Sequence, residues 1–461
     1  MAAAGTATPL TALDSTFLGL ESAESPMHLG ALLRFGPGGP PADVLPVLLA
    51  ERAARSPRLR QVVSVPLNPF KAPQWVPDPN FHAPRHVRVH EVGGGAGAVE
   101  RLAASLMAGP LHRGLPPWEL HVLFRPGGPE EGFHLLTKLH HAAVDGLRAV
   151  EIVTRLFDRL QHSAASAVAS PGAPSAPSTP VSGPPPVPPV GPPFVPTLPA
   201  PLRRLTDQAL RSSSVLTGVA TAALGSVMRP SGHPLHSPTG SVDRVLTLRS
   251  FPLAELQRVR RAHGGTLHDV VLALLAGALR RWYLGLGHDP ERHSTRVLVP
   301  VSRRTRAGEV LHGNQLSGYL VTLPLSEPDP LVRLFRVRES MAACKDHGPS
   351  RGAGAVATLP ELLPAGVQRF TGPLLRPTAP LLFDALATDV PIPGLPFTLG
   401  GAPLAAVHPL PPLAQGHLLA LATSRYRDRV HVTVHGTVVS YRDPRLLGPA
   451  LSAELAELLR T

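Results

Sequence analysis

Two adjacent histidines open the stretch His140-His141-Ala142-Ala143-Val144-Asp145-Gly146. A neutral imidazole has an unperturbed pKa of about 6.5, so it can take a proton from a hydroxyl group and return it to a leaving group near neutral pH. Neighbouring residues on a strand point to opposite faces, so these two rings do not readily chelate one metal ion. The pair therefore favours acid–base chemistry over a metal site.

The segments on either side of this stretch predict how His141 is held. From Phe133 to His141, every second side chain falls on one face of an extended chain, and that face is mainly apolar. From Leu147 to Leu160, apolar residues recur at helical spacing. A strand that ends at an imidazole, turns at Asp145-Gly146 and enters an amphipathic helix would fix His141 as a general base.

Asp145 has three possible roles in this arrangement. Its carboxylate can orient His141, pair with a distant arginine, or cap the helix that begins near Leu147. The residues alone leave these alternatives open.

Composition limits the class of protein. The chain has 461 residues, enough for two or three domains. Its net charge of +12 favours anionic partners, such as a membrane surface or a phosphorylated ligand, although arginines on solvated faces would give the same charge. We find no basic cluster interleaved with aromatic residues, so we expect no nucleic-acid partner.

The single cysteine, Cys344, excludes an intrachain disulfide and a thiolate-rich metal site, and its helical surroundings predict a packing role. The first residues lack the basic region and apolar core of a secretory signal. No window has the roughly 18–20 continuous apolar residues of a spanning helix. We therefore expect a cytoplasmic protein that touches a membrane without crossing it.

A change in composition predicts the domain organisation. Residues 163–200 contain no charged residue and are rich in proline, serine and alanine, which predicts a flexible linker. Residues 1–162 and 201–461 each mix expected strands and helices. The sequence thus predicts an α/β (α+β) fold with an N-terminal lobe at 1–162, which carries the histidine stretch, and a C-terminal lobe at 201–461.

The segment His140 to Gly146 matches the HHxxxDG signature of the CoA-dependent acyltransferase superfamily. Five further blocks, in chain order, resemble those of bacterial wax ester synthase/diacylglycerol acyltransferases. They are residues 9–35, Pro116 to Leu120, residues 266–281, VPVSRR at 299–304 with GNQ at 313–315, and TDVPIPG at 388–394. The resemblance extends over nearly the whole chain outside the linker.

This resemblance implies two lobes like chloramphenicol acetyltransferase, with mixed sheets flanked by helices and a tunnel between them. It implies that His141 is the catalytic base and that His140 and Gly146 shape its loop. It implies a structural Asp145 paired with an arginine of the other half, for which Arg304 is the candidate. Asn314 would line the site and stabilise the oxyanion.

The resemblance also implies the reaction: transfer of an acyl group from acyl-CoA to diacylglycerol or a long-chain alcohol, at an anionic membrane or lipid-droplet surface. Acyl-CoA is then a substrate, and we expect neither a cofactor nor a metal. Three alternatives remain. They are a glycerophosphate-type acyltransferase, in which His140 and Asp145 form an H-x₄-D pair, a carrier-protein-dependent condensation enzyme, and a lipid-binding protein without turnover.

Three departures from the family pattern concern substrate choice more than reaction type. His268-Asp269 stands where the family usually has Asn-Asp, and Pro117 stands in place of a leucine. The segment Asp389 to Pro393 replaces an Asn-Val-Pro-Gly-Pro block.

Overall fold

The computed structural model describes residues 7–68, 71–158, 233–238, 243–302, 316–347 and 379–461. These residues belong to one compact unit, which comprises residues 1–158 and 214–461. The predicted linker at 163–200 lies outside the described residues, so its character and the domain limits stay predictions.

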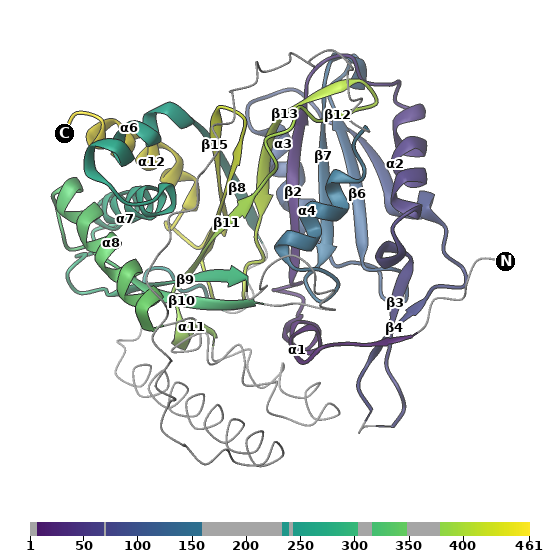
Figure 1. Cartoon of the computed structure of the whole chain (residues 1–461), viewed down its shortest axis with the longest axis horizontal. Helices are drawn as coiled ribbons and strands as arrows, with labels where there is room; N and C mark the ends of the chain where they lie inside the picture. The colour runs from purple at the N-terminus through teal and green to yellow at the C-terminus, as the bar shows by residue number, and fades with distance from the viewer. Residues whose placement is uncertain (1–6, 69–70, 159–232, 239–242, 303–315, 348–378) are drawn as a thin grey trace, which may run out of the picture. The chain divides into compact units, whose positions relative to one another are not determined.

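Two six-stranded mixed sheets organise the unit (Figure 1). The first sheet has four antiparallel strand pairs and one parallel pair, which is β5 (Val87–Glu91) with β6 (Trp118–Phe124). Its strands, in spatial order, are β12 (Thr398–Leu399), β13 (Ala402–Leu410), β2 (His28–Phe35), β7 (Phe133–His140), β6 (Trp118–Phe124) and β5 (Val87–Glu91). Thus two strands from the second half of the chain complete the sheet that carries the histidine stretch.

The second sheet combines antiparallel pairs with a strand, β11, that runs parallel to both of its neighbours. In spatial order its strands are β10 (Leu316–Leu323), β9 (Thr295–Ser302), β11 (Ala385–Pro391), β14 (Leu419–Tyr426), β15 (Arg429–Thr437) and β8 (Arg244–Pro252). A small third sheet has the order β1 (Thr8–Pro9), β4 (Gln74–Pro77) and β3 (Gln61–Ser64). The mixed sheets confirm the predicted α/β class.

Helices cover the sheets and bury their apolar faces. In the first half, α2 (Val44–Ala54) and α4 (Gly146–Thr154) pack against one face of the first sheet, and α3 (Ala98–Ala108) packs against the other. A further helix, α1 (Ala12–Leu20), precedes β2 and begins with a capping box formed by Thr11 and Asp14. This side-chain cap satisfies backbone groups that the first helical turn leaves unpaired.

The second sheet packs its apolar face against helices that lie together on one side (Figure 1). These helices are α6 (Leu253–His263), α7 (Leu267–Gly285), α8 (Pro330–His347) and α12 (Leu447–Leu458), and the short α11 (Ala379–Leu382) precedes β11. A capping box formed by Thr266 and Asp269 starts α7. Cys344 packs against this core, as expected.

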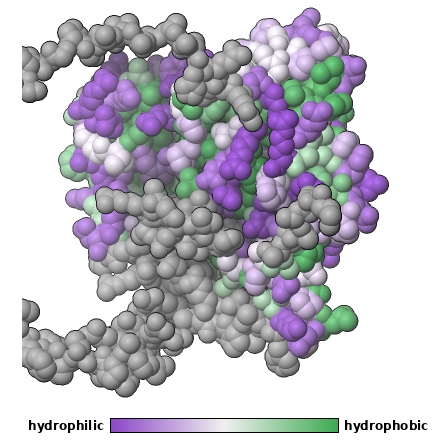
Figure 2. Space-filling model, turned by 45° about the vertical axis from the view of Figure 1, so that its right-hand side comes forward, coloured by the Kyte–Doolittle hydropathy of each residue, from purple (hydrophilic) through white to green (hydrophobic). Residues whose placement is uncertain are grey.

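The described helices were compared with the length and hydropathy that a membrane-spanning helix needs. None of them is, by itself, long and apolar enough to cross a bilayer. Only α6 and α7 taken together satisfy the length and composition criteria, and the chain bends by 98° between them. On the face shown in Figure 2, hydrophilic and hydrophobic side chains are interspersed over the described surface.

Candidate active site

His141 lies directly after β7, where a turn leads into α4. Its backbone N–H donates to the carbonyl oxygen of Met27, with an N–O distance of 3.0 Å. Met27 adopts a φ of 51°, in the left-handed region that costs a residue with a side chain roughly 1–2 kcal/mol. The chain therefore accepts local strain at the residue that holds His141 in place.

The imidazole of His141 stacks on the ring of Phe17 from α1. The ring centroids are 4.0 Å apart and the planes are inclined by 27°. The His141 residue is 9% exposed, so its ring is held by packing but still reaches open space. The sequence analysis missed Phe17, although Leu13, Phe17 and Leu20 share one helical face and all three line the adjacent cavity.

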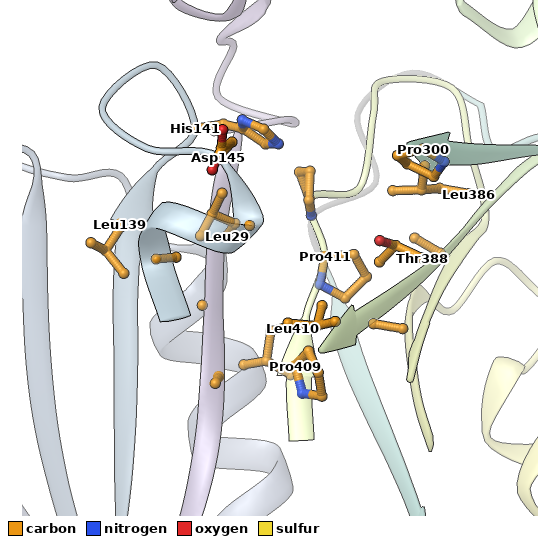
Figure 3. Close-up of a pocket in the computed structure, with 18 of the residues that line it drawn as sticks. Leu29, Leu139, His141, Asp145, Pro300, Leu386, Thr388, Pro409, Leu410 and Pro411 are labelled. Carbon is orange, nitrogen blue, oxygen red and sulfur yellow. The ribbon is translucent and has the colours of Figure 1, made fainter. Parts of the chain in front are cut away.

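His141 borders a cavity of about 750 Å³ that side chains from both halves of the chain enclose. From the first half, the lining includes alternate residues of β7, Thr137 and Leu139, on the face that the sequence predicted to end at His141. Figure 3 shows His141 and Asp145 together at one side of this space. A volume of this size fits a long apolar ligand.

The opposite wall comes from the second sheet. In Figure 3, Pro300 of β9 and Leu386 and Thr388 of β11 lie across the space from His141. The segment Pro409 to Pro411 lies between the two walls. The ring of His141 is thus at a cavity shared by both halves.

His140 points away from this space and does not line the cavity. Its Nδ1 accepts a hydrogen bond from the backbone N–H of Ala142 at 3.0 Å. Its Nε2 lies 4.0 Å from Glu21 Oε2. Burial, with a smaller contribution from His141, lowers the pKa of His140 to about 3. A ring that stays neutral and supports the turn fits the predicted loop-shaping role.

Asp145 caps α4. Its side chain accepts a hydrogen bond from the N–H of Arg148 at 2.8 Å, and its backbone is extended, as is usual for a capping residue. The carboxylate is buried, at 3% exposure, and borders the cavity beside His141. Capping is therefore one role that the structure assigns to it. The predicted partner, Arg304, lies outside the described residues, and so does Asn314.

Gly146, the first residue of α4, lines the cavity. A Cβ atom at this position would meet no atom within 4 Å among the described neighbours. The glycine therefore leaves room beside His141 rather than relieving a clash.

The block from Pro116 to Leu120 packs next to β7 and does not face the cavity. None of its residues lines the cavity. Trp118 is buried and donates from Nε1 to the carbonyl oxygen of Leu59 at 2.7 Å, and Glu119 Oε2 lies 3.2 Å from the ammonium of Lys138. Burial opposes ionisation of Glu119, but a hydrogen bond from His121 and the charge of Lys138 outweigh it and lower the pKa of Glu119 to about 2.

Two of the departures from the family pattern meet near the cavity. Burial lowers the pKa of His268, and the nearby charge of Asp389 partly opposes this. Asp389 lines the cavity and accepts a hydrogen bond from Thr423 Oγ1 at 2.8 Å. Neither ring nitrogen of His268 has a hydrogen-bond partner among the described residues. His268 itself does not line the cavity, so of these two residues only Asp389 contributes to its wall.

The comparisons with known proteins agree with the motif resemblance. The family model described as the wax ester synthase/diacylglycerol acyltransferase catalytic domain matches residues 10–271, and the model of the C-terminal domain of the same family matches residues 312–459. A probable diacylglycerol O-acyltransferase of Mycobacterium tuberculosis, tgs1, is 28% identical over 435 residues, which cover 92% of this chain and 89% of that protein.

Solved structures share the fold. The wax ester synthase/diacylglycerol acyltransferase from Marinobacter aquaeolei VT8 aligns with a TM-score of 0.66 and 23% identity, over 98% of both chains. The first condensation domain of the CDA synthetase aligns with a TM-score of 0.59 and 16% identity, over 99% of this chain and 97% of that one. These likenesses confirm the predicted two-lobe architecture. By its sequence matches, the chain belongs to the wax ester synthase/diacylglycerol acyltransferase family of acyltransferases.

Proposed function

We propose that this protein transfers an acyl group from acyl-CoA to the hydroxyl group of diacylglycerol or a long-chain alcohol, with His141 as the general base. The observation that carries the proposal is the position of His141, at the wall of a largely apolar cavity of about 750 Å³ between the two halves. The relatives support the substrate classes, because they are named as a diacylglycerol O-acyltransferase and a wax ester synthase.

The proposed reaction passes through a complex of enzyme, acyl-CoA and alcohol. His141 removes the hydroxyl proton, and the alcohol oxygen attacks the thioester carbonyl. The tetrahedral intermediate then expels the CoA thiolate, which takes the proton back from His141. General-base catalysis of this kind contributes roughly 10²–10⁴-fold, and holding both substrates together contributes as much or more. Acyl-CoA is a substrate here, and the proposal needs no acyl-enzyme and no resident cofactor.

The surroundings of His141 suit this role. Stacking on Phe17 and the hydrogen bond to Met27 fix the ring and its backbone, so little reorganisation is needed when the proton moves. Asp145 holds the start of α4 beside the ring. The cavity lining is largely apolar, which disfavours water beside the thioester and limits its hydrolysis. Stabilisation of the oxyanion by Asn314 and pairing of Asp145 with Arg304 stay predictions.

The rival assignment makes His140 the base of an H-x₄-D pair. His140 does not line the cavity, and its Nδ1 already accepts the N–H of Ala142. Its pKa of about 3 also makes it a weak acceptor for a proton near neutral pH. These observations favour His141.

We also propose that the protein works in the cytoplasm, at an anionic membrane or lipid-droplet surface, because its acceptors partition into lipid. The net charge of +12 favours such a surface. Between β3 and β4, Val65 and Leu67 are exposed at 60% and 102%, which provides apolar side chains for shallow contact with lipid. Liposomes with anionic lipid should bind the protein better than neutral liposomes at low salt. Equal binding would contradict a role for the charge.

The function is tested with purified protein and labelled palmitoyl-CoA, offered diacylglycerol and hexadecanol in separate reactions, with products resolved by thin-layer chromatography. We expect labelled ester with at least one acceptor and without any carrier protein. Tight acyl-CoA binding without ester would favour a lipid-binding protein. Product formed only with a carrier-bound acyl group would favour a condensation-type enzyme.

A further inference from the structure

Three side chains with metal-ligating atoms meet outside the reaction machinery described above. They are His233, His236 and Asp384, and their candidate ligand atoms all lie within 4.8 Å of one another. His236 Nε2 is 3.0 Å from Asp384 Oδ1, and His233 Nδ1 is 3.6 Å from the same oxygen. Both histidines therefore converge on one carboxylate oxygen.

A tight turn brings the two histidines together. The N–H of His236 donates to the carbonyl oxygen of His233 at 2.9 Å, and the ring centroids are 5.0 Å apart. His236 also forms an isolated β-bridge with His417, whose side chain lines the cavity. The local backbone thus presents two imidazoles from a short segment, at a spacing of three residues.

The carboxylate of Asp384 is fixed from its other side. Asp384 has no exposed surface. Its Oδ2 accepts the N–H of Arg296 at 2.7 Å, and its own N–H donates to the carbonyl oxygen of Arg296 at 2.8 Å. These bonds orient Oδ1 towards the histidines, as the outer hydrogen bonds of metal sites orient their ligands. A carboxylate held in the interior is also stabilised by a nearby positive charge.

Two separations between the ligand atoms are close to those found around a small divalent ion. Zinc binds histidine nitrogen and carboxylate oxygen at about 2.0–2.2 Å in a tetrahedron, which separates neighbouring ligand atoms by about 3.3 Å. The two separations of 3.0 and 3.6 Å lie on either side of that value. The N–H of Leu235 lies 3.3 Å from His233 Nδ1 and donates to it. A metal would compete with this long hydrogen bond.

We propose that His233, His236 and Asp384 bind one divalent transition-metal ion, for which zinc is the best match. The ring of His293, with its centroid 5.7 Å from that of His233, or a water molecule is available for the fourth position. The ion ties the turn that holds the histidines to the start of β11, whose Leu386 and Thr388 line the cavity. Its role is structural. The proposal departs from the sequence-based expectation of no metal and does not depend on the proposed acyl transfer.

The test uses the full chain, stripped with a chelator and then dialysed against zinc, with the bound metal measured by mass spectrometry. We expect about one zinc ion per chain, as in other sites with this ligand set. The variant His236→Asn removes a partly exposed ligand, and we expect the affinity of the protein for zinc to fall by at least about 10–100-fold. Losses of that size already follow the mutation of residues that only hydrogen-bond to a metal ligand. His112→Asn, at an exposed histidine outside the site, is the matched control and should bind zinc like the unmodified chain.

Cobalt provides a second readout, because tetrahedral cobalt absorbs strongly in the visible range. We expect this absorption in the unmodified chain and in His112→Asn, and its loss in His236→Asn. Zinc should also raise the unfolding temperature of the unmodified chain and not that of His236→Asn. Equal zinc binding by all three proteins would mean that scattered surface histidines bind the zinc, and this would overturn the proposal. The absence of any zinc binding would overturn it too. Neither acyl-CoA nor acceptor is present, so failure here leaves the proposed function untouched.

Discussion

The rings of Phe17 and His141 are stacked with centroids 4.0 Å apart, although one belongs to the first helix and the other follows a strand more than a hundred residues later. Stacking limits rotation of the imidazole about its side-chain bonds. A fixed base loses less entropy when it meets the acceptor hydroxyl in the transition state.

Replacing Phe17 with leucine should therefore lower kcat by about tenfold, because it frees the base. The KM for acyl-CoA should change less, because leucine keeps an apolar side chain at the cavity wall. Phe17→Tyr keeps an aromatic ring against His141 and should retain most of the activity. Steady-state kinetics with circular dichroism as a folding control measure both. A purely structural role for Phe17 would instead lower the unfolding temperature and leave the kcat of the folded fraction unchanged.

His140 should behave as a structural residue. His140→Leu leaves the buried N–H of Ala142 without its acceptor, which costs about 1–3 kcal/mol of folding free energy. His140→Asn supplies a carbonyl oxygen near the position of Nδ1 and should recover much of that loss. Urea unfolding of both variants measures the difference. If His140→Asn were stable but inactive, the H-x₄-D assignment would gain support over ours.

Gly146 should control access to the base. Gly146→Ala places its Cβ in open space and should fold at least as well as the unmodified chain. Gly146→Phe fills the same space beside His141 and should reduce turnover of long acceptors several-fold more than turnover of short ones. Competition between alcohols of different length measures this preference. An unchanged preference in Gly146→Phe would contradict the placement of the substrate next to α4.

Stability should fall in mild acid. Burial is the first cause that lowers the pKa of seven described histidines to about 3 or 4: His28, His134, His140, His408, His417, His431 and His435. Below about pH 6.5 the unfolded chain takes up protons on these residues while the folded chain does not, so unfolding becomes easier as the pH falls. At about pH 7.5 and above, the histidines of both states are mostly neutral and the effect becomes small.

Urea midpoints should therefore be highest at about pH 7.5, lower at about pH 6.5, where histidines of the unfolded chain are half protonated, and lower still at about pH 5.5. His134→Gln removes one of these groups, so the dependence on pH should become weaker by about 1.4 kcal/mol per pH unit in the acid range. Unchanged midpoints down to pH 5.5 would show that these histidines titrate in the folded protein.

Local sequence patterns predicted much of the fold. The alternation from Phe133 to His141 located the strand and the side that faces the cavity, and the helical spacing from Leu147 onward located α4. These features depend on neighbours in the chain, so their signals are present in short windows.

Long-range features were not predicted. Residues 402–410 carry little strand signal and contain two prolines, yet they form β13 and pair with β2 in the first sheet. The predicted domains assign these residues to the C-terminal lobe. No local pattern indicates that they join the sheet of the N-terminal lobe instead. The strained backbone of Met27 and the stacking of Phe17 likewise depend on contacts between distant segments. The site is therefore built largely from features that short windows do not contain.

The central claim is that one imidazole at the shared cavity moves the proton. Ester formation from labelled palmitoyl-CoA by His141→Ala, compared with that by the unmodified chain, tests it most directly. We expect a fall of about 10²–10⁴-fold in kcat, with acyl-CoA binding and the circular dichroism spectrum retained. Near-normal turnover by a folded His141→Ala protein would contradict the account.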